Sequence, residues 1–355
     1  MSTNSTLTIG NIFDVLKMKL PSGGPLTNVL NALAARDDFM AFTPAFPANE
    51  GLTHHALRTI SLPTGYLVDV GGSWKASKSQ REKVVEVLAT VRSTYQAPTD
   101  TFTTEDPAVG KALLRAEKID HMMMLNQSLT RMVFGDPTAT PTPNQSGLVG
   151  FAQRAPYATI DNKFTFDVGG TGNDLRSAWL MKPGVDTLHY LYNKHHPTLG
   201  IDMTDKGEQL IQGLGDSSDE HRYDIFIEFM FQKGIFIRDQ RALKRICNIP
   251  AGVTDNPGAD LFNQIINASI INAPTGGTMQ VEADGRVTDT PAPWILLCDE
   301  RVYAKLVIES NNKLVVNQSD NNIYRTKLPM IGDNIIIARQ DSLNQPLGSG
   351  ETLLT

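Results

Sequence analysis

The longest hydrophobic pattern in the chain repeats with the period of an α-helix between residues 106 and 134. Asp106 is a good N-cap, Pro107 suits the first helical position, and the "GDP" that begins at Gly135 ends the pattern. One apolar stripe contains Met122, Leu125, Leu129, Met132 and Val133, and a second begins with Val109, Leu113 and Ala116. At about 1.5 Å per residue, this predicted helix would be roughly 40 Å long, which is typical of a structural spine.

The rest of the chain mixes strand-like segments with shorter helices. Residues 51–104 predict a long hairpin-like excursion, with "LPTGYLVDVGGSWKASKS" in its middle and "REKVVEVLATVRSTY" as a returning strand. Further strands are expected in 175–183 and 188–194 around the turn "PGVD", in 222–239 as a strand or hairpin, in 294–298, and in 328–344; helices are expected in 24–38, 256–273 and 299–311. Because helices and antiparallel strands do not strictly alternate, the pattern predicts an α+β fold.

Composition and charge restrict the class of protein. The chain has 355 residues, of which 41% are hydrophobic and 20% charged, as in an ordinary globular protein. The formal net charge of −6 provides no overall basic surface of the kind that grips nucleic acid. Cys247 and Cys298 make neither a disulfide framework nor a complete zinc site. No apolar run approaches the ~20 residues of a membrane span, and the N-terminus lacks signal-peptide regions, so we expect a soluble protein made in the cytoplasm.

Two glycine-rich segments offer the most specific candidate chemistry. "VDVGGSW" at Val68–Trp74 and "TFDVGGTGNDLRSAW" at Thr165–Trp179 resemble the phosphate loops of actin-like sugar kinases. Such a kinase also needs a base aspartate near the sugar and two loops that face each other across a cleft. Here a Lys-Ser segment follows the first copy and a buried-looking strand follows the second. Paired glycines also mark bends and close backbone approaches, so the motif alone leaves a kinase possible but disfavoured.

The other polar residues do not form a recognisable catalytic or metal-binding set. His54–His55 and His195–His196 are adjacent pairs, and neighbours in a strand point to opposite faces. The acidic loop at 215–221 lacks the carboxylate spacing of an EF-hand. No nucleophile elbow, Walker loop or zinc-protease motif occurs. We therefore expect no catalytic, cofactor-binding or metal-binding residues and no enzymatic turnover.

The order of the segments is more informative than any single motif. The matching segments are "NVLNALAARDDFMAFTPAFPANEG", "LRTISLPTGYLVDVGGSWKASKSQ", "RMVFGDP", "GLVGFAQR", "DVGGTGNDLRSAWLMKPG" and "YDIFIEFMFQKGIFIRDQRALKRICNI". In this order they resemble a family of tailed-bacteriophage major capsid proteins, of the short-tailed (podovirus) type, with the HK97-like fold. Within the second segment, the residues at the family's positions are Arg58, Thr59, Leu62, Pro63, Lys78 and Ser79. The resemblance covers about Asn28 to Arg339, and it departs where "VGGSWKA" replaces the expected acidic or aromatic residues.

The resemblance implies a specific architecture. It divides the chain into an N-terminal arm at 1–51, an extended β-hairpin loop (E-loop) at 52–98, a peripheral domain at 99–171 with the spine helix at 106–134, an axial domain at 172–325, and a return to the peripheral domain with a C-terminal tail at 326–355. In such a protein the glycine-rich segments belong to connections around β-strands and not to a nucleotide site.

The resemblance also implies a function. Such a protein self-assembles as hexamers and pentamers into an icosahedral phage head around double-stranded DNA, which it touches only weakly. The expected partners are copies of itself, a separate scaffolding protein, a portal and a cement or decoration protein, with no membrane. The protein would be found in the virion after assembly in the host cytoplasm. An encapsulin-like nanocompartment shell protein and an actin-like sugar kinase are the alternatives.

Three residues near the expected tip of the extended loop are candidates for contact with a neighbouring subunit: Trp74, Lys75 and Lys78. Some capsids of this fold join a loop lysine to a neighbour's asparagine by an isopeptide bond, which also needs a carboxylate to accept a proton. Candidate asparagines include Asn317, Asn321 and Asn322. Nothing in the sequence assembles such a trio, so we expect non-covalent locking through the arm at 1–50 and the loop.

Overall fold

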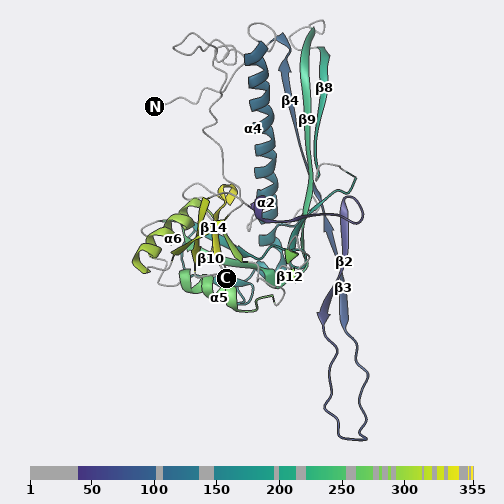
Figure 1. Ribbon diagram of the computed structural model, residues 1–355, viewed down its shortest axis with the longest axis vertical. Coiled ribbons are helices and arrows are strands. Elements are labelled where there is room, and N and C mark those ends of the chain that lie inside the picture. The colour runs from purple at the N-terminus through teal and green to yellow at the C-terminus, as the bar shows by residue number, and fades with distance from the viewer. Residues whose placement is uncertain are drawn as a thin grey trace. The chain divides into compact units, whose positions relative to one another are not determined.

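We analysed a computed structural model of the chain (Figure 1). It describes residues 39–100, 107–135, 148–195, 200–212, 221–252, 261–274, 280–281, 287–288, 293–313, 316–321, 326–331, 335–343, 351 and 353–354. Among the described residues, the first of two compact units contains Thr90–Leu129 and Gly200–Phe231. The second contains Arg36–Ala89, Thr130–Leu199 and Gln232–Thr355.

The first unit packs one long helix against long strands. It contains all or most of four elements: β4 (Ala89–Pro98), α4 (Pro107–Phe134), β8 (Ile201–Gln212) and β9 (His221–Ile237). β8 pairs antiparallel with residues 221–231 of β9, and β4 is the next strand in the sheet order. Leu125 of α4 packs against Ile227 and Phe229 of β9, and all three are buried. The predicted spine helix is confirmed, although its proposed cap Asp106 lies outside the described residues.

The second unit is built on a seven-stranded sheet with the order β14-β15-β16-β13-β6-β10-β5. Its strands are β5 (Thr165–Asp167), β6 (Leu175–Met181), β10 (Leu243–Pro250), β13 (Trp294–Cys298), β14 (Val316–Asn321), β15 (Thr326–Ile331) and β16 (Ile335–Arg339). β6 is antiparallel to both β10 and β13, whereas β13 and β16 are parallel. Every residue of β6 is buried, as expected for a central strand between two covered faces.

Each face of this sheet has its own apolar cover. On one face α5 (Leu261–Ile270) and α6 (Glu300–Lys313) share a core with Leu180 and Leu296. On the other face Trp179, the neighbour of Leu180, packs against the rings of Phe134 and Phe151. This alternation along β6 follows from the two-residue period of a strand.

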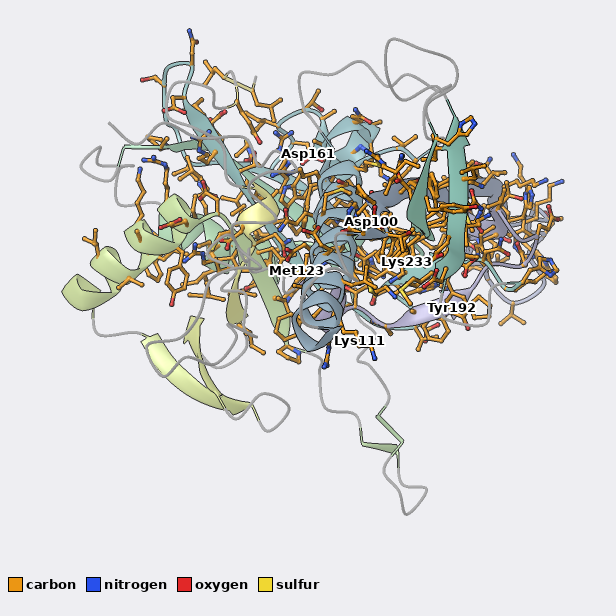
Figure 2. The ribbon with its side chains drawn as sticks, turned by 90° about the horizontal axis from the view of Figure 1, so that it is seen from above. Asp100, Lys111, Met123, Asp161, Tyr192 and Lys233 are labelled. Atoms are coloured by element: carbon orange, nitrogen blue, oxygen red, sulfur yellow. The ribbon has the colours of Figure 1, made fainter. Side chains whose placement is uncertain are left out.

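The remaining elements of the second unit are short, apart from one hairpin. They are α2 (Phe39–Phe42), β1 (Ala45–Pro47), β2 (Thr53–Ser61), β3 (Gln80–Val87), η1 (Phe151–Gln153), η2 (Ala155–Tyr157), β7 (Leu188–Tyr192), η3 (Gln240–Ala242), β11 (Gln280–Val281), β12 (Val287–Thr288) and η4 (Asp341–Leu343). β7 pairs with β1 and with the end of β9, which places Tyr192 opposite Lys233 (Figure 2). β2 and β3 form a separate two-stranded sheet.

The structure confirms the predicted α+β class and differs from the expectations in three places. The stretch "REKVVEVLATVRSTY" does not form one returning strand, because it is divided between β3, which pairs with β2, and β4, which belongs to the sheet of β9. β6 and β7 flank the turn at 183–186, but they belong to different sheets, so the chain crosses between sheets there. β8 was not expected, because its polar sequence "IDMTDKGEQLIQ" suggests a loop, and its pairing with β9 decides the conformation.

Some expectations cannot be compared with the structure. The predicted helix at 24–38 and the loops at 136–147 and 213–220 lie outside the described residues. Within the described part of the chain, no helix has the length and apolar character that a membrane crossing requires.

Candidate subunit interface

Beyond a register shift between Thr59 and Ser61, three contacts join the two sides of the β2–β3 hairpin toward its tip. Ser61 pairs with Gln80, the Ser77 hydroxyl donates to the Thr64 carbonyl at 2.8 Å, and the Gly72 amide donates to the Asp69 carbonyl at 2.9 Å. The two residue numbers of each contact add to the same total, so the two sides of the loop run antiparallel as far as the turn at 69–72. At about 3.3 Å per residue, a side that runs from residue 53 to 70 reaches roughly 55–60 Å. Figure 1 shows this long excursion beyond the arrows of β2 and β3.

The first glycine pair makes the chain reversal at this tip. Gly71 has φ +88°, a backbone conformation that residues with a side chain rarely adopt. It occupies the third position of the Asp69–Gly72 turn, where type II turns require a positive φ. The "VDVGGSW" segment therefore forms the tip of a hairpin.

The second glycine pair has a different structural reason. Gly169 has φ +84°, and its amide donates to Asp167 Oδ1 at 2.8 Å. The Gly170 amide donates to the Asn248 carbonyl at 3.0 Å, and a Cβ at Gly170 would collide with that oxygen. Both amides are thus engaged within the protein, whereas a phosphate loop presents its amides to a ligand. Both glycine pairs belong to connections around strands, as the resemblance implied.

The hairpin exposes an unusual number of large apolar side chains. They are Leu57, Ile60, Leu62, Tyr66, Leu67, Val68, Val70, Trp74 and Val85. Trp74 is 74% exposed and Leu62 is 81% exposed. Single exposed apolar residues are normal, but a contiguous set along one projecting element marks an interaction surface.

The three candidate contact residues lie close to the tip. Lys75 and Lys78 are exposed like Trp74, and Trp74 follows the turn by two residues. Sequence reasoning identified the tryptophan and lysines but not the other apolar residues, although their alternation in "LPTGYLVDV" was a visible signal.

The proposed isopeptide partners lie in another part of the second unit. Asn317 and Asn321 belong to β14, the strand at one end of the seven-stranded sheet order, and Asn322 lies outside the described residues. Because the bond would join different copies of the chain, its presence or absence stays a prediction.

The root of the hairpin is fastened by polar contacts. Arg154 binds Glu86 of β3 through two hydrogen bonds of 2.6 and 2.9 Å. Arg58 of β2 donates to the Ile237 carbonyl at 2.9 Å. These contacts attach both strands of the hairpin to other segments of the second unit.

An apolar cluster adds to this attachment. Ala56 and Val84 pack against a cluster that contains Leu88 and Phe236. Gly234 permits the approach, because a Cβ there would lie 3.2 Å from Leu88 Cα. The hairpin is therefore anchored at its root and exposed toward its tip.

The adjacent histidines behave as the strand period predicts. The His54 ring packs on Phe236, with ring centroids 4.9 Å apart, whereas His55 Nε2 pairs with Glu50 Oε2 at 2.7 Å. His196 lies outside the described residues, so the second pair cannot be compared. Over the described ranges, no group of three or more His, Cys, Asp or Glu side chains could hold a metal ion.

Comparison with known proteins places this architecture in a family. The model of the family described as "Major capsid protein GP7" matches residues 21–345. The chain belongs to this family of major capsid proteins. A comparison with curated protein sequences found no significant match.

Three solved structures resemble the chain, and one of them supports the fold. The chain is similar to the bacteriophage epsilon15 cryo-EM structure, with 17% identity, 99% of each chain covered and a TM-score of 0.62. It also matches the bacteriophage JBD30 capsid, with 12% identity, 96% and 100% coverage and a TM-score of 0.48. The SrpI encapsulin of Synechococcus elongatus matches with 7% identity, 69% and 97% coverage and a TM-score of 0.41. The HK97-like fold that the resemblance implied is confirmed by the epsilon15 match.

As a major capsid protein, the chain has a structural function and forms the shell of a phage head from copies of itself. It is therefore a virion component and not an enzyme. The family match favours the phage capsid protein over the two alternatives, a sugar kinase and a cellular compartment protein. For such a protein the functional sites are the surfaces that join one copy to the next.

Proposed function

We propose that the β2–β3 hairpin is a main inter-subunit contact of the shell, and that it lies across an adjacent copy of the chain. The exposed apolar row from Leu57 to Trp74 carries this proposal. In an isolated chain these side chains would stay in water, at a cost of about 25 cal/mol for each Å² of apolar surface left exposed. Covering them on a neighbour removes that cost.

We further infer that the tip residues Trp74, Lys75 and Lys78 contact the neighbour directly. Trp74 supplies a large amphipathic surface of the type that dominates protein interfaces. The lysines can snorkel along apolar surface and place their charges at the polar rim of the contact.

The finer features of assembly belong to the same proposal. Hexamers and pentamers built from one chain would close an icosahedral shell around double-stranded DNA. The resulting head would be of the short-tailed (podovirus) type. Assembly in the host cytoplasm would be directed by a separate scaffolding protein and would incorporate a portal. A cement or decoration protein could add to the locking of the arm and the loop. The net charge of −6 favours weak contact with the packaged DNA.

Replacement of residues 72–78 by a Gly-Ser sequence tests the role of the tip. Because these residues project into solvent, the variant should remain folded and soluble, with an unchanged thermal unfolding midpoint. It should not form closed shells when it is expressed with its assembly partners. Lys163→Ala, at an exposed lysine outside the hairpin, is the control and should assemble normally. Shells of normal yield and stability from the Gly-Ser variant would reject the proposed contact.

A further inference from the structure

Two histidines from different strands pack on one ring at the root of the hairpin. His54 of β2 and His189 of β7 lie on Phe236 of β9, with ring centroids 4.9 and 5.3 Å away. Phe46 of β1 packs on His189 at 4.8 Å. This four-ring cluster, which we call the root cluster, links the hairpin to β1, β7 and β9 through side chains alone.

The root cluster accepts neutral imidazoles more easily than charged ones. His189 is 7% exposed, and the Nδ1 atoms of both histidines are buried without a hydrogen-bond partner in the described part of the chain. A charged imidazole carries a proton on both ring nitrogens. Protonation would therefore leave at least one buried N–H donor without an acceptor, which costs more than an ordinary lost hydrogen bond.

The charged groups around the cluster do not compensate for this cost. Burial lowers the pKa of His54, and the nearby Glu86 carboxylate opposes that shift while His55 adds to it. Glu86, however, is already bound by Arg154 through two hydrogen bonds. It is therefore only partly available to balance a charge on His54.

His189 is in a similar position. Burial lowers its pKa, backbone hydrogen bonds with Gly184 and Val185 oppose the shift, and the charges of His54 and Arg238 add to it. Arg238 is paired with the exposed Asp186 at 2.6 Å, and Arg58 of β2 lines the same groove as both histidines. The positive groups thus outnumber the free negative ones around the two rings.

We propose that the root cluster is an acid-labile anchor, in which protonation of His54 and His189 detaches the inner face of the β2–β3 hairpin from β7 and β9. The groove beside the two histidines has a volume of about 420 Å³ and is lined on the hairpin side by Ala56, Leu57 and Val84. Water can enter along this groove and solvate the charged rings once the hairpin lifts. Detachment leaves the seven-stranded sheet intact, because the cluster shares no residue with its core.

The direction of the pH dependence follows from the lowered pKa values. A histidine whose pKa is lower in the docked than in the detached state binds its proton preferentially when detached. The docked state therefore has its full stability above the unperturbed value of 6.5 and loses stability as the pH falls below it. Each unit of pKa difference makes detachment about tenfold easier at low pH, until both states are protonated.

Hydrogen–deuterium exchange of the full-length, unassembled chain tests the anchor directly. After correction for intrinsic exchange, amides in 53–61 and 80–87 should exchange several-fold faster at pH 5.5 than at pH 7.5, because a two-stranded hairpin released from its support is only marginally stable in water. Peptides from β6 and β10 should not change. The double variant His54→Gln/His189→Phe cannot be charged at these positions and should lose the pH dependence, whereas His221→Gln, at an exposed histidine outside the cluster, should keep it.

Two outcomes would overturn the anchor. One is exchange in wild-type hairpin that does not respond to pH, and the other is a response that persists in the double variant. If the double variant is already detached at pH 7.5, titration of the histidine ring signals by NMR in the wild type decides the question. Both histidines should titrate below 6.5, and a value at or above 6.5 for either would contradict the anchor. The result does not depend on whether the hairpin contacts a neighbour, so it separates the anchor from the proposed assembly role.

Discussion

Arg154 binds Glu86 in a two-pronged ion pair, with Nη1–Oε1 and Nη2–Oε2 distances of 2.6 and 2.9 Å. The side chains are only 14% and 8% exposed, so this pair is much better shielded from solvent than the other arginine pairs on the surface, such as Arg92–Glu228. It joins β3 of the hairpin to the segment that contains η1 and η2. The orientation of the hairpin root therefore depends on this charge pair. Removal of either side chain would leave the other one buried without its partner.

Loss of Arg154 should destabilise the attachment of the hairpin. Arg154→Met leaves the Glu86 carboxylate buried and unpaired, which typically costs about 3 kcal/mol. The expected result is a lower urea midpoint and faster hydrogen exchange in 80–87. The double variant Glu86→Gln/Arg154→Met, which also removes the charge of Glu86, should recover part of the lost stability. The control Arg92→Met removes an exposed arginine and should have little effect on the urea midpoint. Equal midpoints for Arg154→Met and wild type would contradict this role of the pair.

The turn at the hairpin tip should depend on the backbone freedom of Gly71. Because Gly71 has φ +88°, Gly71→Val imposes a left-handed strain of about 1–2 kcal/mol on the turn. We expect faster exchange of the Gly72 amide, whose hydrogen bond to the Asp69 carbonyl closes the turn, and a lower shell yield, with the thermal midpoint unchanged. Gly65→Val is the matched control, because no atom lies within 4 Å of the added Cβ and its φ is not positive. Similar effects of the two substitutions would show that the turn geometry is unimportant.

The first unit contains a buried carboxylate whose contribution should depend on pH. Asp224 accepts hydrogen bonds from Arg222 at 2.6 and 2.8 Å and from Gln96 at 2.8 Å. The Arg222 hydrogen bonds, helped by Gln96, outweigh burial and hold the pKa of Asp224 below 3.8. The stabilisation is therefore complete above pH 3.8 and is lost as the pH falls through the lowered pKa.

Asp224→Asn should accordingly reduce the free energy of unfolding by about 1.5–3 kcal/mol at pH 7. The difference from wild type should shrink below pH 3.8. Urea denaturation at pH 7, 5 and 3 measures it, and Asp186→Asn, at an exposed Arg–Asp pair, should cause little change at any of these values. A deficit that is as large at pH 3 as at pH 7 would contradict the assigned ionisation.

The shell should be locked without covalent bonds. An isopeptide bond would need a carboxylate to accept a proton from Lys75 or Lys78, because a charged lysine is not a nucleophile, and the sequence offers no defined set of such residues. Denaturing gels of mature particles should show one monomer band near 38.9 kDa. A ladder of larger species that survives boiling and reductant would refute non-covalent locking.

Sequence reasoning predicted the elements that have a strong local signal. The helix α4 starts at a proline and carries the buried residues Leu125, Leu129 and Val133 at four-residue spacing. β13 is a continuous apolar run, and β6 ends in the apolar run "AWLM". In contrast, β8 is polar and largely exposed, so its strand conformation comes from pairing with β9 and not from its own residues.

The candidate interface was only partly visible in the sequence. Trp74 is conspicuous because a tryptophan is unexpected in a solvated tip, and the lysines stand beside it in the sequence. The root contacts were not visible, because Glu86 and Arg154 are 68 residues apart, and His54 and His189 are still farther apart. Only folding brings such residues together, and one sequence without relatives carries no sign of their pairing.

Cryo-electron microscopy of purified particles shows both the shell and the position of each hairpin, so it can decide whether the β2–β3 hairpin joins one copy to the next. We expect closed icosahedral shells of hexamers and pentamers in which residues 57–78 of each copy lie on an adjacent copy. In these shells Trp74 should be covered, in contrast to its 74% exposure in the single chain. Closed shells in which the hairpin projects into solvent without touching a neighbour would contradict it.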